Sequence, residues 1–217
     1  MPIMKNYSKI LMFLLISLLS IKANAQTFGV KGGLNLSNML EKDDDDTYSD
    51  DYKMNPGFHI AGTVDIPIST VLSFESGLLF TTKGFRIEED SIKVKTNLYY
   101  IDIPLTVKAS LPLSEGLKIF GAVGPYVGIG LSGKVIATVE YQGDEETDEE
   151  AVKWGSDEDS DDLKRLDYGL TFGGGVEINA LMLGISYDLG LANIATHQED
   201  GYTTKNRVLK FSVGYRF

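Results

Sequence analysis

Apolar and polar side chains alternate along most of the chain from residue 27 to residue 217. The final eleven residues, RVLKFSVGYRF, show the pattern clearly, because Lys210 and Ser212 separate Leu209, Phe211 and Val213. A period of two places successive side chains on opposite faces of a β-strand. No helical period of useful length follows residue 25. The pattern therefore predicts an all-β fold.

Eight segments carry this alternation. Antiparallel neighbours can each be joined by a hairpin, so eight such strands suit a meander. The predicted strands are 27–36, 56–66, 71–83, 94–108, 117–132, 164–178, 182–192 and 205–217.

The connections between these strands alternate in length. Short turns at one end and long polar loops at the other are typical of outer-membrane barrels. We therefore predict an eight-stranded antiparallel up-and-down transmembrane β-barrel. The short connections are 67–70, 110–116 and 179–181, and the long ones are 37–55, 84–93, 133–163 and 193–204.

The polar face of the predicted strands carries charges of both signs and many glycines. Glycine weakens a strand, but small residues make room for charged partners inside a narrow eight-stranded barrel. We expect this face to line the lumen and the apolar face to contact lipid; a soluble lipocalin-like barrel would have the opposite arrangement. The predicted lumen set includes Lys31, Asn35, His59, Thr63, Asp65, Glu75, Lys83, Asp102, Lys108, Arg165, Asp167, Glu177, Asp188, Lys210 and Arg216.

The first 25 residues have the three parts of a secretory signal peptide. Lys5 and Lys9 precede a twelve-residue apolar run, and Ala23-x-Ala25 forms a cleavage site. That run is too short to span a bilayer as a helix. We predict a signal peptide over 1–25 and an outer-membrane barrel domain over 26–217. The chain has no cysteine, so no disulfide can stabilise it.

The chain is acidic, and most of its acidic residues lie in two short segments. The formal net charge is −11, and removal of the signal peptide's three lysines would take it to −14. Such a field disfavours nucleic acid as a partner. Nineteen of the 31 carboxylates lie in residues 41–51 and 140–162.

These acidic segments offer oxygen ligands of the kind that Ca²⁺ prefers. Their spacing does not fit an EF-hand loop, and the alternative is a flexible, self-repelling loop. Trp154 lies among them and is expected either to contact a partner or surface glycan or to pack on the barrel rim. The candidate cation contacts are Asp43, Asp44, Asp45, Asp46, Asp157, Asp159 and Asp161. No other cofactor is expected.

Catalytic motifs are missing from the sequence. It contains no GxSxG, HExxH or Walker loop. His59 falls on the polar face, where it could form an acid–base pair with Asp65 or Glu75. More simply, it fills the lumen as one more polar residue, so we expect a protein that is not an enzyme.

Pro104 and Pro125 fall inside predicted strands. Proline cannot donate to a β-ladder and is found at edges or bulges. A closed barrel has no edge, so local bulges are expected at both positions.

Several strand sequences resemble the PorT-like outer-membrane β-barrel family. The resemblance rests on FGVKGGLNLSN, YYIDIPLTVK, GPYVGIGLSGK, DYGLTFGGGVEI and FSVGYRF. It implies an outer-membrane location in a Gram-negative bacterium and permits a role in a protein-secretion system, but it implies no shared activity. The terminal Phe217 resembles the signal by which barrel-assembly machinery recognises its clients.

Together these features lead us to expect a structural or binding protein. Its partners would be outer-membrane lipid, the assembly machinery and an extracellular ligand or a secretion partner. Both chain termini would lie in the periplasm and the acidic loops outside. An eight-stranded barrel is expected to have no large open pore.

Overall fold

A computed structural model describes residues 26–89, 91–141, 144–197 and 201–217. The predicted signal peptide lies outside these residues. The elements are β1 (Thr27–Lys42), the short 3-10 helix η1 (Tyr48–Asp51), β2 (Asn55–Pro67), β3 (Leu72–Lys83), β4 (Arg86–Glu89), β5 (Ile92–Ser114), β6 (Leu117–Tyr141), β7 (Asp144–Ala151), β8 (Leu166–Ile178), β9 (Leu181–Gly190) and β10 (Thr203–Arg216).

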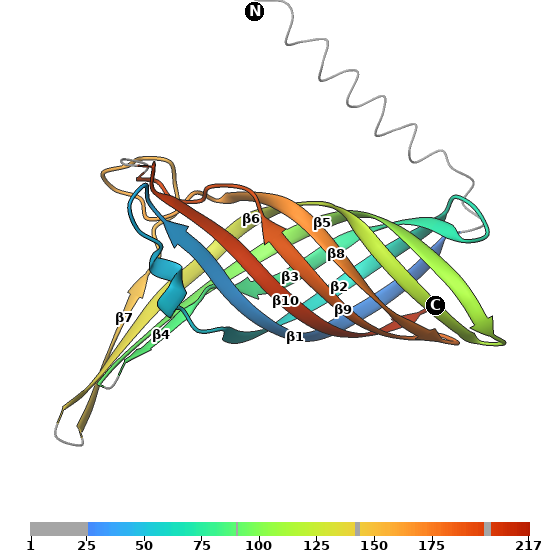
Figure 1. Ribbon diagram of the computed structural model, residues 1–217, viewed down its shortest axis with the longest axis horizontal. Coiled ribbons are helices and arrows are strands. Elements are labelled where there is room, and N and C mark those ends of the chain that lie inside the picture. The colour runs from blue at the N-terminus through green and yellow to red at the C-terminus, as the bar shows by residue number, and fades with distance from the viewer. Residues whose placement is uncertain (1–25, 90, 142–143, 198–200) are drawn as a thin grey trace, which may run out of the picture.

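Eight of these strands close into a barrel, as the sequence predicts (Figure 1). Neighbours pair antiparallel around the ring β1–β2–β3–β5–β6–β8–β9–β10, and β10 pairs with β1 to complete it. The seam is fourteen residue pairs long and runs from Gly29 opposite Arg216 to Lys42 opposite Thr203. Closure pairs the backbone groups of every barrel strand on both sides, which removes the exposed edge of an open sheet.

The two ends of the barrel differ. The end that carries the turns at 68–71, 115–116 and 179–180 is here named the turn end. The start of β1 and the end of β10 also lie there. The opposite end, named the loop end, carries the longer connections. None of the helices in the described part of the chain is long and apolar enough to cross a membrane.

Two strands continue far beyond the barrel at the loop end. β5 begins at Ile92 and β6 extends to Tyr141, and their outer parts pair with each other and with β4 and β7. We name this four-stranded extension the projecting sheet; in Figure 1 it points to the lower left. The expectation of a flexible loop is therefore wrong for residues 144–151, which form β7. Pairing with β6 satisfies the backbone of an acidic segment whose composition alone disfavours order.

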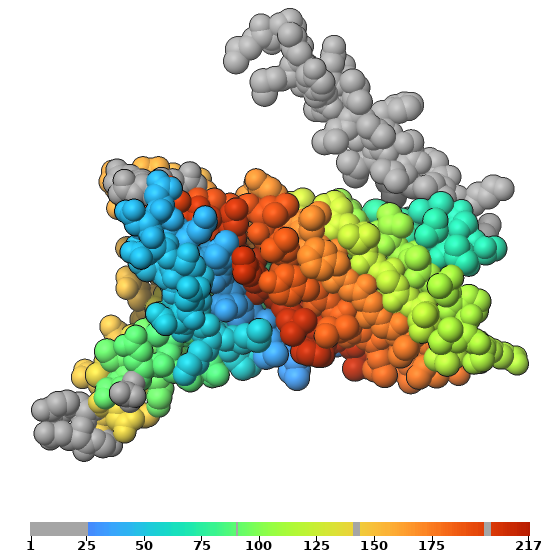
Figure 2. Space-filling view, viewed as in Figure 1, coloured from blue at the N-terminus to red at the C-terminus, as the bar shows by residue number. Residues whose placement is uncertain are grey.

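The apolar face of the barrel points outward. Leu34, Val213 and Phe217 are 67%, 58% and 76% exposed, whereas the lumen residues Asp167 and Lys83 are 0% and 1% exposed. This is the arrangement expected of a barrel in lipid and the reverse of a lipocalin. The outward wall forms the continuous surface of the barrel in Figure 2.

One residue of the predicted lumen set lies elsewhere. Arg165 is exposed just before β8 begins, and its guanidinium donates to the Gly130 carbonyl oxygen at 2.9 Å. The prediction fails here because strand β8 begins at Leu166, two residues later than the predicted strand 164–178.

The prediction of bulges at the two prolines is wrong. Pro104 lies opposite Tyr126 in β6, and the same register resumes beyond it, while Pro125 pairs with Leu170 in β8. Each proline lacks a backbone N–H and so removes one hydrogen bond from the β-ladder. The loss of one hydrogen bond does not require an extra residue in the strand, so no bulge forms. The β5–β6 register instead shifts between Tyr99 and Tyr100, where Leu131 is the extra residue, and near Pro112.

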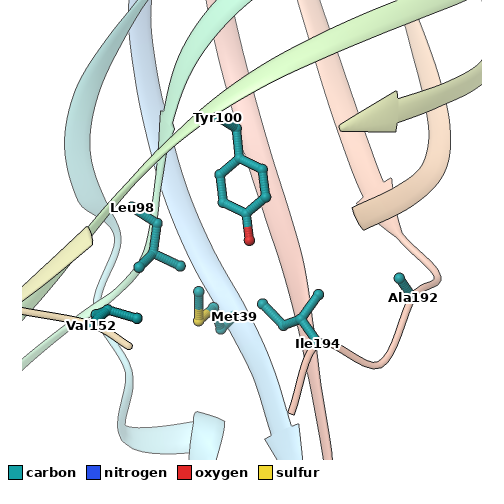
Figure 3. Packing of buried hydrophobic residues seen from close by; sticks show 6 residues of the cluster. All are labelled: Met39, Leu98, Tyr100, Val152, Ala192 and Ile194. Carbon is teal, nitrogen blue, oxygen red and sulfur yellow. The ribbon is translucent and has the colours of Figure 1, made fainter. Parts of the chain in front are cut away.

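The apolar core of the molecule lies at the loop end. Strand and loop residues pack together there in one apolar cluster (Figure 3). The buried members are Met39, Leu98, Tyr100, Val152, Ala192 and Ile194, and Tyr52, Phe85, Val135, Trp154 and Leu163 pack against them.

Candidate functional site: the lumen and the projecting sheet

An ionic network fills the lumen near the turn end. Lys108 Nζ lies 3.2 Å from Glu177 Oε1 and 3.5 Å from Glu75 Oε2, and it also pairs with Asp65. Arg216 pairs with Asp65 at 3.1 Å and with Glu177 at 2.8 Å. Each of these two cations therefore bridges carboxylates from different strands.

A second network lies nearer the loop end and centres on Lys83. Its ammonium nitrogen is 2.9 Å from Asp102 Oδ2 and 2.8 Å from Asp167 Oδ2. Tyr126 and Asn206 also donate to Asp167 Oδ2, at 3.2 and 2.9 Å. Buried charges are tolerated when they are paired and hydrogen-bonded in this way.

Glycine makes room for this second network. A Cβ atom at Gly128 would lie 2.2 Å from Asp102 Oδ1. No side chain can occupy that space unless the carboxylate moves. The predicted role of small residues beside lumen charges is confirmed at this position.

His59 lies between the two networks, away from its predicted acid–base partners. Its Nδ1 donates to Asn35 Oδ1 at 2.7 Å, since an amide oxygen can only accept, and its Nε2 is 2.9 Å from Ser212 Oγ. In the described residues neither Asp65 nor Glu75 hydrogen-bonds to His59. The ring thus belongs to a neutral polar contact between β1, β2 and β10.

The lumen is filled rather than open. A cavity of about 70 Å³ remains beside the turn-end network, and Lys31, His59 and Phe120 are among the residues that line it. Among the described residues, five lumen cations face six lumen carboxylates, so the interior is almost neutral. They are Lys31, Lys83, Lys108, Lys210 and Arg216, and Asp65, Glu75, Asp102, Asp167, Glu177 and Asp188.

Three of the seven predicted cation contacts, Asp43, Asp157 and Asp161, accept local hydrogen bonds. Asp43 accepts from the backbone N–H groups of Asp45 and Asp46 and from the Tyr48 hydroxyl at 2.5 Å. This hydroxyl bond lowers the pKa of Asp43 and raises the pKa of Tyr48 to about 12.

Asp157 and Asp161 make similar bonds in their own loop, with Asp161 Oδ2 accepting from the Asp157 N–H at 3.0 Å. The fold brings Asp43 and Asp161 to one loop-end cavity of about 650 Å³. No group of three or more potential metal-ligating side chains occurs in the described part of the chain. The calcium site stays a prediction.

Trp154 packs on the barrel rim, which is one of its two predicted positions. Its ring meets Tyr100 edge-on at 5.6 Å, and a Cβ at Gly130 would lie 2.4 Å from it. The Arg165 guanidinium lies 5.9 Å from the same ring.

The projecting sheet has two chemically different faces. On the face that continues the outer wall of the barrel, acidic and basic side chains pair: Lys134 with Glu149 at 2.9 Å and Lys93 with Glu145 at 3.5 Å. We name this the outer face. Its charges are therefore largely neutralised.

The opposite face, named the inner face, continues the lumen wall. Register places Ile87 beside Val94, Val94 beside Ala137, and Ile92 beside Val139. Ile92 and Val139 are 46% and 45% exposed. An apolar stripe therefore crosses three strands of this face.

A row of carboxylates borders the stripe on the inner face of β7. Glu146 lies opposite Val139, Asp148 opposite Ala137 and Glu150 opposite Val135, with Asp144 next along the strand. None of the four makes an ion pair or a hydrogen bond with the described residues. Sequence reasoning identified this segment as acidic but missed the division between faces, because the division depends on the Leu131 bulge.

Comparison with known proteins gives the family. The family described as "Outer membrane protein beta-barrel domain" matches residues 24–196. No curated relative matches the chain.

Several solved structures are similar to this chain. Ail, the attachment invasion locus protein of Yersinia pestis, is 16% identical with a TM-score of 0.39, and the match covers 89% of this chain and 99% of that chain. OprG from Pseudomonas aeruginosa is 11% identical with a TM-score of 0.45, with 89% and 96% covered. The outer membrane protease OmpT from Escherichia coli is 10% identical with a TM-score of 0.32, with 91% and 98% covered. With its closed antiparallel barrel and a family match over most of its length, this chain belongs to the family of outer-membrane proteins built on a β-barrel domain.

Proposed function

We propose that this protein is a non-enzymatic outer-membrane barrel that binds a cationic polypeptide segment on the inner face of its projecting sheet. The observation that carries the proposal is the row of unpaired carboxylates beside the exposed apolar stripe. The filled lumen supports a role in binding rather than in passage of solutes.

The proposal places the loop end outside the cell and both chain termini in the periplasm. Outer-membrane barrels have short periplasmic turns and longer outer loops. The chain has no native cysteine, so labelling of a single introduced cysteine shows on which side of the membrane that residue lies. On whole cells, a membrane-impermeant maleimide should label Thr147→Cys in β7 and leave Ser69→Cys in a short turn unlabelled. The reverse labelling would refute this orientation.

The chemistry of the partner follows from the inner face. A strand added beside β7 would place alternate side chains on that face. Lysine or arginine there would meet Glu146, Asp148 and Glu150, and opposite charges across neighbouring strands contribute about 0.2–1 kcal/mol a pair. Apolar residues of the same partner would cover Ile92 and Val139. A cationic segment with interspersed apolar residues is thus the best complement.

The test is binding of a synthetic peptide of alternating lysine and valine to the purified barrel. The inner-face variant Glu146→Gln/Asp148→Asn/Glu150→Gln should weaken binding about tenfold, as three lost pairs imply. The outer-face variant Glu140→Gln/Glu145→Gln/Glu149→Gln removes the same number of charges and should leave binding within about twofold. Equal loss in both variants would show a general charge effect and refute the inner-face site.

The PorT-like resemblance supports a second candidate, a component of a protein-secretion system. Co-purification of a secretion partner with the native protein from outer membranes would favour it over a free-standing barrel. In either case we propose that barrel-assembly machinery recognises the last strand through Phe217. Phe217→Ala should then reduce the amount of assembled barrel in outer membranes without affecting refolding in detergent.

A further inference from the structure

A cleft on the outer wall of the barrel has the opposite charge to the rest of the loop end. Its volume is about 430 Å³, and Lys164, Arg165, Leu166 and Tyr168 line it together with Gly155, Ser156, Ala192 and Asn193. No carboxylate lines it, although the chain carries a net charge of −11. The side chains that line the cleft therefore carry a net positive charge.

The lower part of the cleft belongs to the lipid-facing wall. Leu166 and Tyr168 open β8 on its outward face, and they are 54% and 49% exposed. Tyrosine is enriched where the hydrocarbon meets the polar headgroups. Lys164 and Arg165 come directly before these residues in the chain, which puts their charges at the polar edge of the same apolar surface.

Arg165 is held in place by neutral partners. Its Nη1 donates to the carbonyl oxygens of Gly130 and Leu131 at 2.9 and 3.4 Å, and its guanidinium carbon lies 5.9 Å from the Trp154 ring. None of these partners neutralises its charge. The Lys164 side chain makes no ion pair or hydrogen bond within the described residues. Two unpaired cations, one of them fixed in position, thus face the cleft.

We propose that this cleft binds the anionic headgroup of a membrane lipid. Lys164 and Arg165 would contact a phosphate or carboxylate, because a fixed guanidinium suits such planar or tetrahedral oxyanions. Leu166 and Tyr168 would contact the first part of the acyl chain. The proposal depends on the barrel lying in a membrane and is independent of any partner on the projecting sheet.

The test is a titration of the full barrel in non-ionic detergent with short-chain phosphatidic acid. Trp154 is the only tryptophan of the chain and lies beside Arg165, so its fluorescence reports on the cleft. Phosphatidic acid should give a saturating change, and phosphatidylcholine with the same chains should bind at least tenfold more weakly. Lys164→Gln should weaken phosphatidic acid binding about tenfold, in line with the loss of one charged contact.

A matched variant and a free anion complete the experiment. Lys93→Gln removes one exposed lysine from the projecting sheet and should leave lipid affinity unchanged. Equal affinity for the choline lipid, or an unaltered affinity in Lys164→Gln, would overturn the proposal. Inorganic phosphate that binds as tightly as phosphatidic acid would also overturn it, since the site would then recognise a free anion rather than a lipid.

Discussion

Lys83 shows how single residues hold the lumen together. Its side chain is fully buried, and its ammonium group is the only cation that the described residues place beside both Asp102 and Asp167. The rings of Tyr100 and Tyr126 lie 4.4 and 4.7 Å from the same nitrogen. Charge and aromatic contacts from three strands, β5, β6 and β8, therefore converge on one side chain.

Replacement of Lys83 by methionine should destabilise the barrel strongly. The change keeps most of the volume but leaves two buried carboxylates without a counter-ion, a loss of about 3–5 kcal/mol. Urea unfolding in a lipid or detergent environment measures this loss in the free energy of unfolding. Lys93→Met, which breaks an exposed pair with Glu145, should cost less than about 1 kcal/mol. Similar losses for both variants would contradict the network.

Tyr48 supports a prediction about pH at the loop end. Its hydroxyl donates to Asp43, and this bond raises the pKa of Tyr48 from 10.0 to about 12. A raised tyrosine pKa favours the neutral phenol in the folded state. Its contribution to stability is thus fully present below pH 10 and is lost as pH rises through 12.

The Asp43→Asn variant tests this bond. Without the carboxylate acceptor, the pKa of Tyr48 should fall toward 10, which NMR titration of its ring carbons can follow. The Asp50→Asn change in η1 is a suitable control, because Asp50 makes no hydrogen bond with Tyr48. A Tyr48 pKa that stays near 12 in Asp43→Asn would refute the assignment.

The β6 strand is the element that decides the character of the loop end. Even-numbered residues such as Gly128 and Gly130 face the lumen, but beyond Leu131 the odd-numbered residues Val135 and Val139 continue the inner surface. One extra residue thus reverses the alternation. It aligns the apolar side chains of β6 with those of β5 and carries the β7 carboxylates to the same face.

Deletion of both Leu131 and Ser132 should disorder the projecting sheet but not the barrel. With two residues fewer, Val135 and Val139 would turn to the outer face and Lys134 to the inner face. Hydrogen exchange should then be fast in 144–151, which pairs with this part of β6, and remain slow in 166–178. Deletion of Leu131 alone is the control, because Ser132 would follow Gly130 directly and stay opposite Tyr99, so 144–151 should remain protected. Retained protection of 144–151 in the double deletion would show that the register of β6 does not determine the order of the sheet.

At the scale of the whole molecule, the lumen, the projecting sheet and the outer wall of the barrel differ in charge. Lumen charges of both signs neutralise each other, the inner face of the projecting sheet keeps unpaired carboxylates, and the outer wall keeps the unpaired cations of the Lys164 cleft. The space-filling view shows how the compact barrel continues into the narrow projection (Figure 2). A closed barrel can maintain this separation because each strand presents its two sets of side chains to different environments.

The filled lumen predicts negligible conductance. Ion pairs from most strands occupy the interior, and an apolar cluster packs above them at the loop end. In planar bilayers the purified barrel should give no sustained single-channel steps. A porin reconstituted in the same way is the positive control. Steps on the nanosiemens scale would contradict a plugged interior.

Local alternation was enough to predict most of the barrel. Strand number, strand order and the two faces follow from a period of two, because that geometry belongs to each strand by itself. The lumen position of Lys83, Asp102 and Asp167 could be predicted in this way, as could the outward position of Phe211 and Val213. The strand boundaries at the loop end could not be predicted in this way, because β5 and β6 continue through residues whose composition suggests loops.

What the sequence by itself determined is therefore a barrel with a polar interior and an apolar wall. Only the tertiary structure decided which charges meet and which stay unpaired. The β7 carboxylates share a face with Val139 because a single bulge in β6 reverses its alternation, and Arg165 lies on the wall because β8 begins after it. Such outcomes depend on pairing between strands far apart in the chain, and local periodicity carries no information about that register.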